Sequence, residues 1–548
     1  MELTAFPRQF ARTRRFSLGV PQRFTVSPDG ERVLFLRSVS GTEPRSLLWL
    51  HENGEERVLA GAGECAGECE RESAGRGEEA SSAGVVSYAT DRRARVVAYV
   101  LDGALHTVTT DGGAPRRISV PAPVTDPRPS PDGSLIAYVS GGALRVVRTD
   151  GTADRPLAEP ETPDVTYGLP DHVATVSIGR TRGFWWSPDG GALLVARVDT
   201  SMVRRWYVAD PADPARPPRA VRYPAAGTAN AQTSLRLVTV GGEHTPVALP
   251  REAPGSDTPV GVWRDAAFEY LVAADWDHMG PTATVQTRDQ RTAWVLGVDP
   301  STGAVEPLSR HTDDAWVEFP PGTPLRTASG VAVLPYVHDD TRSIRIGDVP
   351  TPAGLRVRAV LVTDGRGTPG RGVAWQRTIV GDRLTPVLED QIDALHAAAE
   401  RNGALDLTRV AIRGWSFSGY LAAGAVLRRP DVFHAAVAGA PPTDRRLYDT
   451  YWEERFLGHP DVQPEQYERS SLLPFASGPT RPLLLVHGLA DDNVFPAHTL
   501  RLSAALLAAG RPHTVLPLRA TGHLVAREGT ADALLLRELA FLRESLGA

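Results

Sequence analysis

The sequence predicts a chain of two parts, a β-propeller over roughly its first two thirds and then an α/β domain. Three observations predict this arrangement: repeated turn-and-strand units, similar units spaced about 40 residues apart, and alternating strand and helix patterns after Leu361. The predicted α/β domain has a parallel sheet with helices on both faces, because strand–helix alternation requires crossover connections.

The first observation is a repeated turn, Ser-Pro-Asp-Gly, at Ser27–Gly30, Ser130–Gly133 and Ser187–Gly190. An apolar run follows each copy, for example Leu135–Val139. Proline presets φ and glycine accepts a positive φ, so the motif suits a tight turn between strands. Each copy therefore predicts a β-hairpin.

The second observation is an internal repeat. The run Gly103–Val108 resembles Gly142–Val147, which begins 39 residues later, and an Asp-Gly pair follows both. A period of about 40–50 residues with several strands per unit is typical of propeller blades. An array of β-sandwiches is the alternative, but the regular period and the repeated turn favour the propeller.

The third observation is the change of pattern after Leu361. The expected strands are Val410–Ile412, Val437–Ala438, Leu483–Val486 and Val515–Leu518. The expected helices are Val387–Arg401, Tyr420–Arg429, Ala497–Ala509 and Ala531–Leu546.

Composition excludes several classes of function. The formal net charge of −6 argues against a nucleic-acid partner. No apolar run is long enough to span a bilayer, so we expect no membrane association. The two cysteines, Cys65 and Cys69, form neither a disulfide framework nor a metal-binding pattern. We therefore expect a cytoplasmic protein without a metal or cofactor.

The candidate nucleophile is Ser416, in Gly-Trp-Ser-Phe-Ser-Gly at Gly414–Gly419. The motif lies between a predicted strand and a predicted helix, which is the setting of the nucleophile elbow of α/β-hydrolases. The usual fifth residue is glycine, whereas this chain has Ser418. Serine is the next smallest choice, and some crowding is expected there.

The acid and the base of such a hydrolase follow the serine in the chain, in that order. Asp491 and Asp492 follow one predicted strand and His523 follows the next, so both groups reach the same rim as Ser416. His487 also lies near this rim, but its place directly before Gly488 favours a structural role. The backbone N–H of Phe417 is expected to be one oxyanion donor, and an earlier strand–loop should supply the second.

These motifs resemble the prolyl oligopeptidase family of serine peptidases, together with Asp-Gly-Arg-Gly-Thr-Pro-Gly-Arg-Gly at Asp364–Gly372 and Leu-Glu-Asp-Gln at Leu388–Gln391. The dipeptidyl peptidase IV-like branch is the most similar, and its members join a propeller to an α/β-hydrolase with the active site between them. The resemblance implies a propeller over residues 1–357 and a catalytic domain over 358–548. It also implies that Asp491, not Asp492, is the triad acid and that Asn493 helps to hold the substrate carbonyl.

Two departures from the family concern the substrate pocket. Val176 and Ser177 correspond to the paired glutamates that grip the substrate amine in that branch, and neither can pair with an ammonium ion. Arg445 stands where the family has tryptophan in its S1 pocket. A buried guanidinium needs a partner, so the pocket is either narrower or open to an acidic side chain. The residues that match the S1 pocket are Phe417, Pro442, Arg445, Tyr448, Trp452 and Val494.

A third departure is an apparent internal deletion near Ala359. The family's early Tyr-Gly-Gly-Pro-like segment, whose tyrosine is the second oxyanion donor, has no counterpart here. Loss of one oxyanion donor typically reduces the rate by about 10²–10³. A shortened sheet and propeller expose edges, so lower stability or a homo-oligomer is expected.

The function expected from the sequence is a serine peptidase that cleaves short peptides through an acyl-enzyme at Ser416, with access gated by the propeller. Two alternatives stay open. One is a hydrolase of esters or amides that are not peptides, and the other is a catalytically impaired relative that binds peptides. The intact Ser/Asp/His set favours the enzymes, and the missing tyrosine and glutamates favour the impaired relative.

Overall fold

A computed structural model describes most of the chain, namely residues 5–61, 84–253, 259–260, 263–264, 267–319, 325–326, 332–333, 360–369, 371–478, 481–525 and 527–547. Cys65, Cys69, Ala359 and the predicted boundary between residues 357 and 358 lie outside these ranges.

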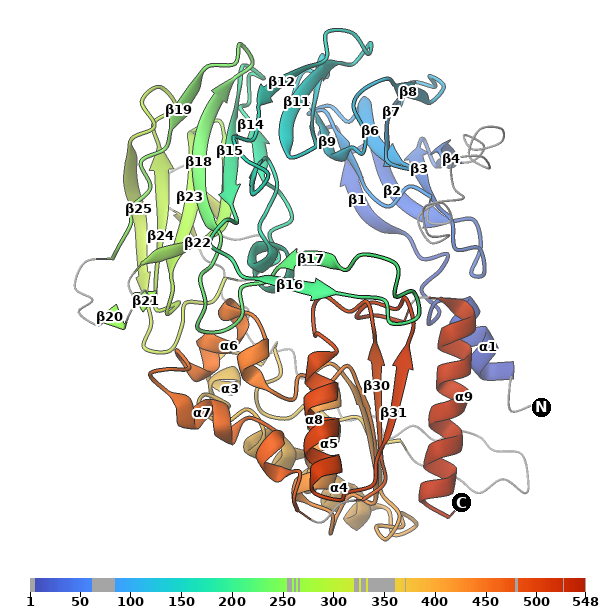
Figure 1. Cartoon of the computed structure of the whole chain (residues 1–548). Helices are drawn as coiled ribbons and strands as arrows, with labels where there is room; N and C mark the ends of the chain where they lie inside the picture. Colours follow the sequence, from blue (N-terminus) through green and yellow to red (C-terminus); the bar gives the residue numbers. More distant parts are fainter. Residues whose placement is uncertain are drawn as a thin grey trace.

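The N-terminal part is a series of antiparallel sheets that stand side by side in an arc, as expected for propeller blades (Figure 1). The first sheet contains β1 (Gln22–Val26), β2 (Arg32–Ser38), β3 (Ser46–Glu52) and β4 (Glu55–Ala60). The second contains β5 (Tyr88–Thr90), β6 (Val96–Leu101), β7 (Ala104–Thr109) and β8 (Arg116–Ile118). The third contains β9 (Thr125–Pro129), β10 (Leu135–Ser140), β11 (Ala143–Arg148) and β12 (Arg155–Ala158).

Two further sheets continue the arc. The fourth contains β13 (Val165–Tyr167), β14 (Phe184–Trp186), β15 (Ala192–Asp199), β18 (Gln232–Thr239) and β19 (His244–Pro246). The fifth contains β22 (Phe268–Asp277), β23 (Gly280–Thr287), β24 (Thr292–Val298) and β25 (Val305–Thr312). Short two-residue strands are β20 (Pro259–Val260), β21 (Trp263–Arg264), β26 (Leu325–Arg326) and β27 (Ala332–Val333).

The Ser-Pro-Asp-Gly turns form the predicted hairpins. They connect the antiparallel pairs β1–β2, β9–β10 and β14–β15. The three glycines have φ of 78°, 75° and 74°, which is why glycine is needed there. In the second copy the Ser130 hydroxyl donates to Asp132 at 2.6 Å and closes the turn. The two similar runs are β7 and β11, which occupy the same place in neighbouring sheets.

A separate hairpin leaves the fourth sheet between β15 and β18. It is formed by β16 (Arg205–Val208) and β17 (Arg219–Arg222), and it lies between the arc of sheets and the α/β domain (Figure 1). Its Trp206 ring lies 4.7 Å from the Tyr223 ring and 4.6 Å from the Phe495 ring. The hairpin is therefore packed onto the α/β domain through aromatic side chains.

The C-terminal part is a parallel sheet of β28 (Ala411–Trp415), β29 (Ala435–Gly439), β30 (Leu483–Gly488) and β31 (Thr514–Leu518), in that order. The helices α4 (Thr385–Arg401), α5 (Phe417–Arg428) and α8 (Ala497–Ala508) cover one face. Helix α9 (Glu528–Ser545) covers the other face, and α1 (Ala5–Arg12) packs against α9. The remaining helices are α3 (Val373–Arg377), η3 (Arg445–Leu447), α6 (Thr450–Leu457), α7 (Pro464–Arg469) and η4 (Leu473–Phe475).

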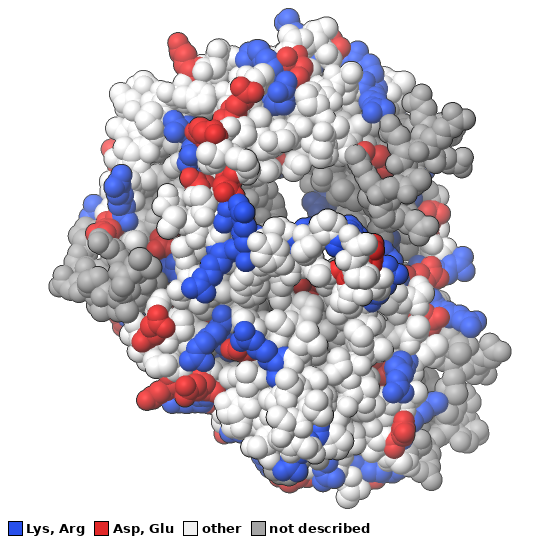
Figure 2. All heavy atoms as spheres, viewed as in Figure 1, with Lys and Arg blue, Asp and Glu red and all other residues white. Residues whose placement is uncertain are grey.

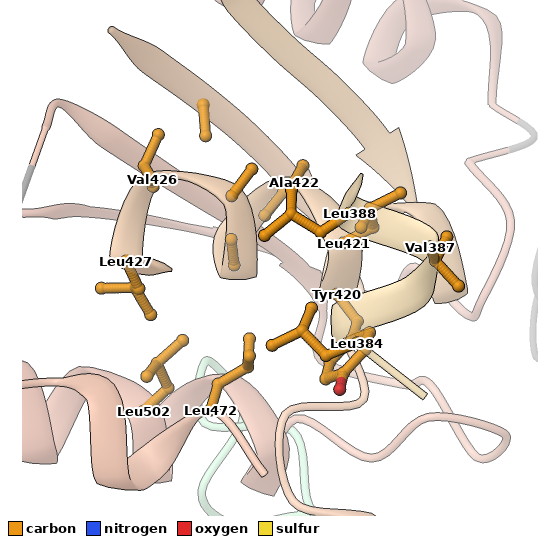
Figure 3. Close-up of a cluster of buried hydrophobic side chains, with 14 of the residues drawn as sticks. Leu384, Val387, Leu388, Tyr420, Leu421, Ala422, Val426, Leu427, Leu472 and Leu502 are labelled. Atoms are coloured by element: carbon orange, nitrogen blue, oxygen red, sulfur yellow. The ribbon is translucent and has the colours of Figure 1, made fainter. Parts of the chain in front are cut away.

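Side chains of each strand alternate between the two cores. Leu485 of β30 packs with α4, α5 and α8, whereas Leu484 and Val486 pack with α9. Figure 3 shows the first core, where Leu384 and Leu388 meet Tyr420 and Leu421 of α5. All four predicted strands and all four predicted helices are present within a few residues of their expected bounds. The predicted fold class is confirmed.

The arc of sheets is joined to the α/β domain through helix α6. Gln286 accepts a hydrogen bond from the Tyr451 hydroxyl at 3.1 Å, and Asn230 accepts one from Thr450 at 2.6 Å. Arg288 pairs with Glu454. Because these contacts are buried, they fix which part of the sheets faces the rim of the α/β domain. No helix in the described ranges is long and apolar enough to cross a membrane.

Candidate active site

Ser416 lies in a sharp turn between β28 and α5. Its φ of 57° and ψ of −124° are unusual for a residue with a side chain, and such strain is typical of functional sites. The Ser416 N–H donates to Gly439 O at 2.8 Å, and Ser416 O accepts from Tyr420 N at 2.9 Å. These bonds hold the turn from both sides and place the serine at the carboxyl end of β28.

Glycines around the turn are required by close approach. A Cβ on Gly414 would lie 2.0 Å from Ser418 O, and one on Gly419 would lie 2.3 Å from Gly439 O. Ser418 itself is exposed, so the expected crowding at this position is absent from the structure. The glycine that this elbow needs after the serine is Gly419.

Asp491 and His523 meet at the same rim. Asp491 follows β30 and His523 follows β31, and the distance from Asp491 Oδ2 to His523 Nδ1 is 2.8 Å. The other carboxylate oxygen of Asp491 accepts from the N–H groups of Asn493 and Val494 at 3.0 and 2.9 Å. Burial alone would raise the pKa of Asp491, but its interactions with His487 and His523 hold it below the usual aspartate value. The carboxylate therefore stays ionised and fixes the imidazole through Nδ1.

Two contacts position the His523 loop, and the first depends on a glycine. A Cβ on Gly488 would lie 2.3 Å from Thr521 O, so only glycine lets the Asp491 loop approach the His523 loop this closely. The Trp415 indole N–H donates to His523 O at 2.8 Å. The residue before the nucleophile thus positions the backbone of the histidine.

No hydrogen bond joins Ser416 Oγ to the His523 ring, although both residues are described. Catalytic hydrogen bonds are often long without substrate and shorten in the complex. The His523 side chain is 18% exposed, so it is partly accessible at the rim. The arrangement has the order and placement that a Ser–His–Asp nucleophile requires.

His487 is buried and has a structural environment. Its Nδ1 lies 2.7 Å from the Thr499 hydroxyl, and its Nε2 donates to Val494 O at 2.7 Å. His487 Nε2 also lies 3.6 Å from Asp491 Oδ2. The His487 ring therefore holds the Asp491 loop through its hydrogen bond to Val494 O, which is a structural role.

Asp492, the neighbour of Asp491, points elsewhere. Its carboxylate is 49% exposed and pairs with Arg219 of β17 at 2.8 Å. Asp491 is fully buried and pairs with His523. Of the two candidate acids, the structure brings only Asp491 to the histidine.

The predicted substrate-binding residues fall into two neighbouring groups. In the first, the Tyr448 hydroxyl donates to Asn493 Oδ1 at 3.0 Å, and Val494 is buried beside Asp491. In the second, Phe417, Trp452 and Arg445 surround a buried cation, Arg383. Tyr448 links the groups, because its N–H donates to Arg445 O at 3.3 Å. Pro442 is buried in the segment that precedes η3.

Arg445 and Arg383 share one acidic partner, Glu453 of α6. Both guanidiniums reach Glu453 Oε1, at 3.2 Å from Arg445 and 2.6 Å from Arg383. The prediction that a buried Arg445 needs a partner is met by Glu453. Burial lowers the pKa of Arg383, whereas at Arg445 burial is outweighed by Glu453 and Tyr420 together, which raise the pKa.

Val176 and Ser177 lie in η2 (Ala174–Ile178), a short helical segment of the fourth sheet that packs against α6. The Val176 side chain is 41% exposed. The Ser177 hydroxyl donates to Asp449 Oδ2 at 2.8 Å. Burial raises the pKa of Asp449 to about 6. The position that the sequence comparison assigned to an amine-binding glutamate thus holds a hydroxyl that supports a buried acid.

Asp449, Glu453 and Arg383 were not singled out in the sequence. Asp449 had a detectable signal, because an aspartate three residues before Trp452 is a helix N-cap and accepts its N–H at 2.9 Å. Arg383 gave no signal, since it is separated from Glu453 by 70 residues and only the fold brings them together.

Of the two expected oxyanion donors, the structure describes the Phe417 N–H. The Phe417 N–H opens helix α5, where the first N–H groups have no partner within the helix and are available to a substrate oxygen. The apparent deletion near Ala359 lies outside the described residues. In the described part of the chain, no three His, Cys, Asp or Glu side chains gather as a metal site would require.

Comparison with known proteins agrees with this geometry. Residues 356–548 match the prolyl oligopeptidase family, and residues 86–342 match the dipeptidyl peptidase IV N-terminal region. Human dipeptidyl peptidase 8 is 37% identical over 193 residues, which cover 34% of this chain and 21% of that protein. Dipeptidyl peptidase family member 1 of Caenorhabditis elegans is 36% identical over 162 residues, which cover 29% and 20%. The matched segments thus span about a fifth of these relatives.

The whole fold is also similar to a solved structure. The crystal structure of Porphyromonas gingivalis dipeptidyl peptidase 4 superposes with a TM-score of 0.74, over 95% of this chain and 97% of that chain, at 18% identity. The two family matches thus identify a prolyl oligopeptidase family region over residues 356–548, preceded by a dipeptidyl peptidase IV N-terminal region over residues 86–342.

Proposed function

We propose that this protein is a serine peptidase that cleaves short peptides through an acyl-enzyme on Ser416. The observation that carries the proposal is the Asp491–His523 pair at the same rim as Ser416 in its strained turn. His523 Nε2 would take the Ser416 proton as Oγ attacks the peptide carbonyl, and the amine would leave with that proton. Water would then attack the acyl-enzyme carbonyl while His523 takes its proton, and that proton would return to Ser416 Oγ as the acid product leaves.

The substrate would be held by groups on either side of the nucleophile. The Phe417 N–H would stabilise the oxyanion, and Asn493, oriented by Tyr448, would contact the substrate carbonyl. Phe417, Pro442, Arg445, Tyr448, Trp452 and Val494 would line the S1 pocket. The propeller would gate access, and Figure 2 shows the molecule hollowed between the sheets and the β16–β17 hairpin. The proposed catalytic domain begins at residue 358.

The second candidate function is a relative of low activity that binds peptides. The lack of a Tyr-Gly-Gly-Pro-like segment favours it. If no other group replaces the tyrosine, turnover should fall by about 10²–10³ relative to a complete relative. Self-association and a cytoplasmic location stay predictions.

The deciding experiment is labelling with a fluorophosphonate. The wild-type protein should be labelled at a single serine, and Ser416→Ala should remove the label while the matched variant Ser418→Ala keeps it. Labelling together with hydrolysis of dipeptidyl amides supports the peptidase. Labelling with hydrolysis of simple esters alone would indicate a non-peptide hydrolase. Unchanged labelling of Ser416→Ala would exclude the assignment.

A further inference from the structure

Two buried arginines lie directly beneath the residue that follows the nucleophile. The Phe417 ring centroid is 5.4 Å from Arg445 Cζ and 5.1 Å from Arg383 Cζ. Phe417 begins α5, one residue after Ser416. The positive charge of this pair therefore lies next to the residue that follows the nucleophile.

The charge of this cluster is not balanced within the protein. Arg383, Arg445 and Glu453 are each at most 1% exposed, and two cations share one carboxylate. The neighbouring aspartates have other partners. Asp444 pairs with Arg501 at 2.7 Å, and the Asp449 carboxylate accepts hydrogen bonds from the Ser177 hydroxyl and the Trp452 N–H. A net positive charge out of contact with water is costly unless another group pairs with it.

The unpaired edge of Arg445 has the right geometry for a carboxylate. Arg445 binds Glu453 through Nη1 only, and its Nε and Nη2 are buried without a hydrogen-bond partner. Nε and Nη2 together form one side of the guanidinium fork, which can donate two parallel hydrogen bonds to a carboxylate. Arg383 Nε is also unpaired. Glu453 Oε2 is buried without a partner too, so Glu453 does not neutralise this edge.

We propose that Arg445, together with the positive charge of Arg383, makes the S1 pocket specific for an acidic side chain. The peptide bond on the carboxyl side of a glutamate or aspartate would then be the one that is cleaved. The inference rests on the proposed peptidase function and names its substrate class. The substrate carboxylate would pair with the Nε–Nη2 edge of Arg445. Its methylene groups would pack against Phe417 and Trp452, whose rings already lie against the guanidiniums.

The first test compares dipeptidyl amide substrates that differ only in the residue on the amino side of the cleaved bond, namely Glu, Gln, Asp, Asn and Pro. Glutamate and glutamine have the same shape, so their ratio isolates the charge. We expect kcat/KM to be at least about tenfold higher for Glu than for Gln, because charge-assisted bidentate bonds are the stronger kind. Equal rates for Glu and Gln, or a preference for Pro, would overturn the inference.

The second test assigns the preference to Arg445. Arg445→Met should raise KM for the Glu substrate far more than for the Gln substrate and so remove the Glu/Gln ratio, which a purely structural role would not do. The matched control is Arg446→Met, because Arg446 is the exposed neighbour. A Glu/Gln ratio that survives in Arg445→Met would refute the role of Arg445. If this variant does not fold, the wild-type ratio still decides the inference.

A binding measurement separates this inference from the proposed catalysis. Peptide products ending in Glu or in Gln are titrated into Ser416→Ala by calorimetry, and the Glu product should bind at least about tenfold more tightly. Tighter binding of the Glu product without any wild-type turnover would support the pocket and reject the peptidase. Turnover of Pro substrates with no preference for Glu would support the peptidase and reject the pocket.

Discussion

Arg288 holds both carboxylate oxygens of Glu454, with hydrogen bonds of 2.6 Å from Nε and 2.7 Å from Nη2. Arg288 follows β23 in the arc of sheets and Glu454 belongs to α6, so the pair crosses between the two parts of the chain. Both side chains are at most 3% exposed. The contact therefore aligns the sheets with the segment that carries Tyr448, Asp449 and Glu453.

Arg288→Met should destabilise the protein by about 3–5 kcal/mol, because it leaves the Glu454 carboxylate buried without its cation. The double variant Arg288→Met/Glu454→Gln should recover part of this loss. Urea unfolding measures both effects. The control is Arg219→Met, whose pair with Asp492 is exposed and should cost less than about 1 kcal/mol. A loss at Arg288 as small as that at Arg219 would contradict this account.

Asp491→Asn should lower kcat by about 10⁴, because the amide no longer accepts the His523 Nδ1 proton and the imidazole adopts the wrong tautomer. Steady-state kinetics on a dipeptidyl amide would show this. Asp492→Asn is the matched control and should keep most of the activity, since Asp492 faces Arg219. If Asp492→Asn loses more activity than Asp491→Asn, the assignment of the acid is wrong.

A free amine two residues from the cleaved bond should not be required. Val176 carries no charge, and the Ser177 hydroxyl is occupied by Asp449. An N-acetylated dipeptidyl amide and its free-amine twin should thus have similar kcat/KM, measured side by side at neutral pH. A strong preference for the free amine would show that an acidic group elsewhere binds it.

Asp449→Asn should stabilise the protein at neutral pH but not in acid. Burial raises the pKa of Asp449 to about 6, from the value near 4 of an exposed aspartate. Folding therefore favours the protonated acid, and this group makes the folded state less stable as pH rises from about 4 to about 6. Asparagine stays neutral, so the advantage of the variant should grow across this window to about 3 kcal/mol.

Urea unfolding of wild type and Asp449→Asn at pH 4, 5, 6 and 7 gives this difference directly. A difference that stays constant from pH 4 to pH 7 would mean that Asp449 is not a buried acid of raised pKa. Kinetics at the same pH values would show whether the Ser177–Asp449 contact matters for substrate binding.

The sequence by itself determined the features that depend on short stretches of chain. Ser27–Gly30 and its two copies specify hairpins because proline and glycine restrict the backbone locally. The alternation of apolar runs after Leu361 specifies a parallel sheet, and parallel strands end at one rim. Ser416, Asp491 and His523 follow three of those strands, so their common location could be predicted.

Only the tertiary structure decided which side chains pair across long separations. Asp491 and Asp492 are chemically identical neighbours, and the direction of the loop after β30 buries one against His523 and exposes the other to Arg219. Ser177 meets Asp449, 272 residues away, only because the sheets dock on α6. The sequence indicated only a single arginine, Arg445, at a position where the family has tryptophan. The fold adds Arg383 beside it and a single shared acid, because packing between distant segments sets the charge balance of a buried site and no local pattern encodes it.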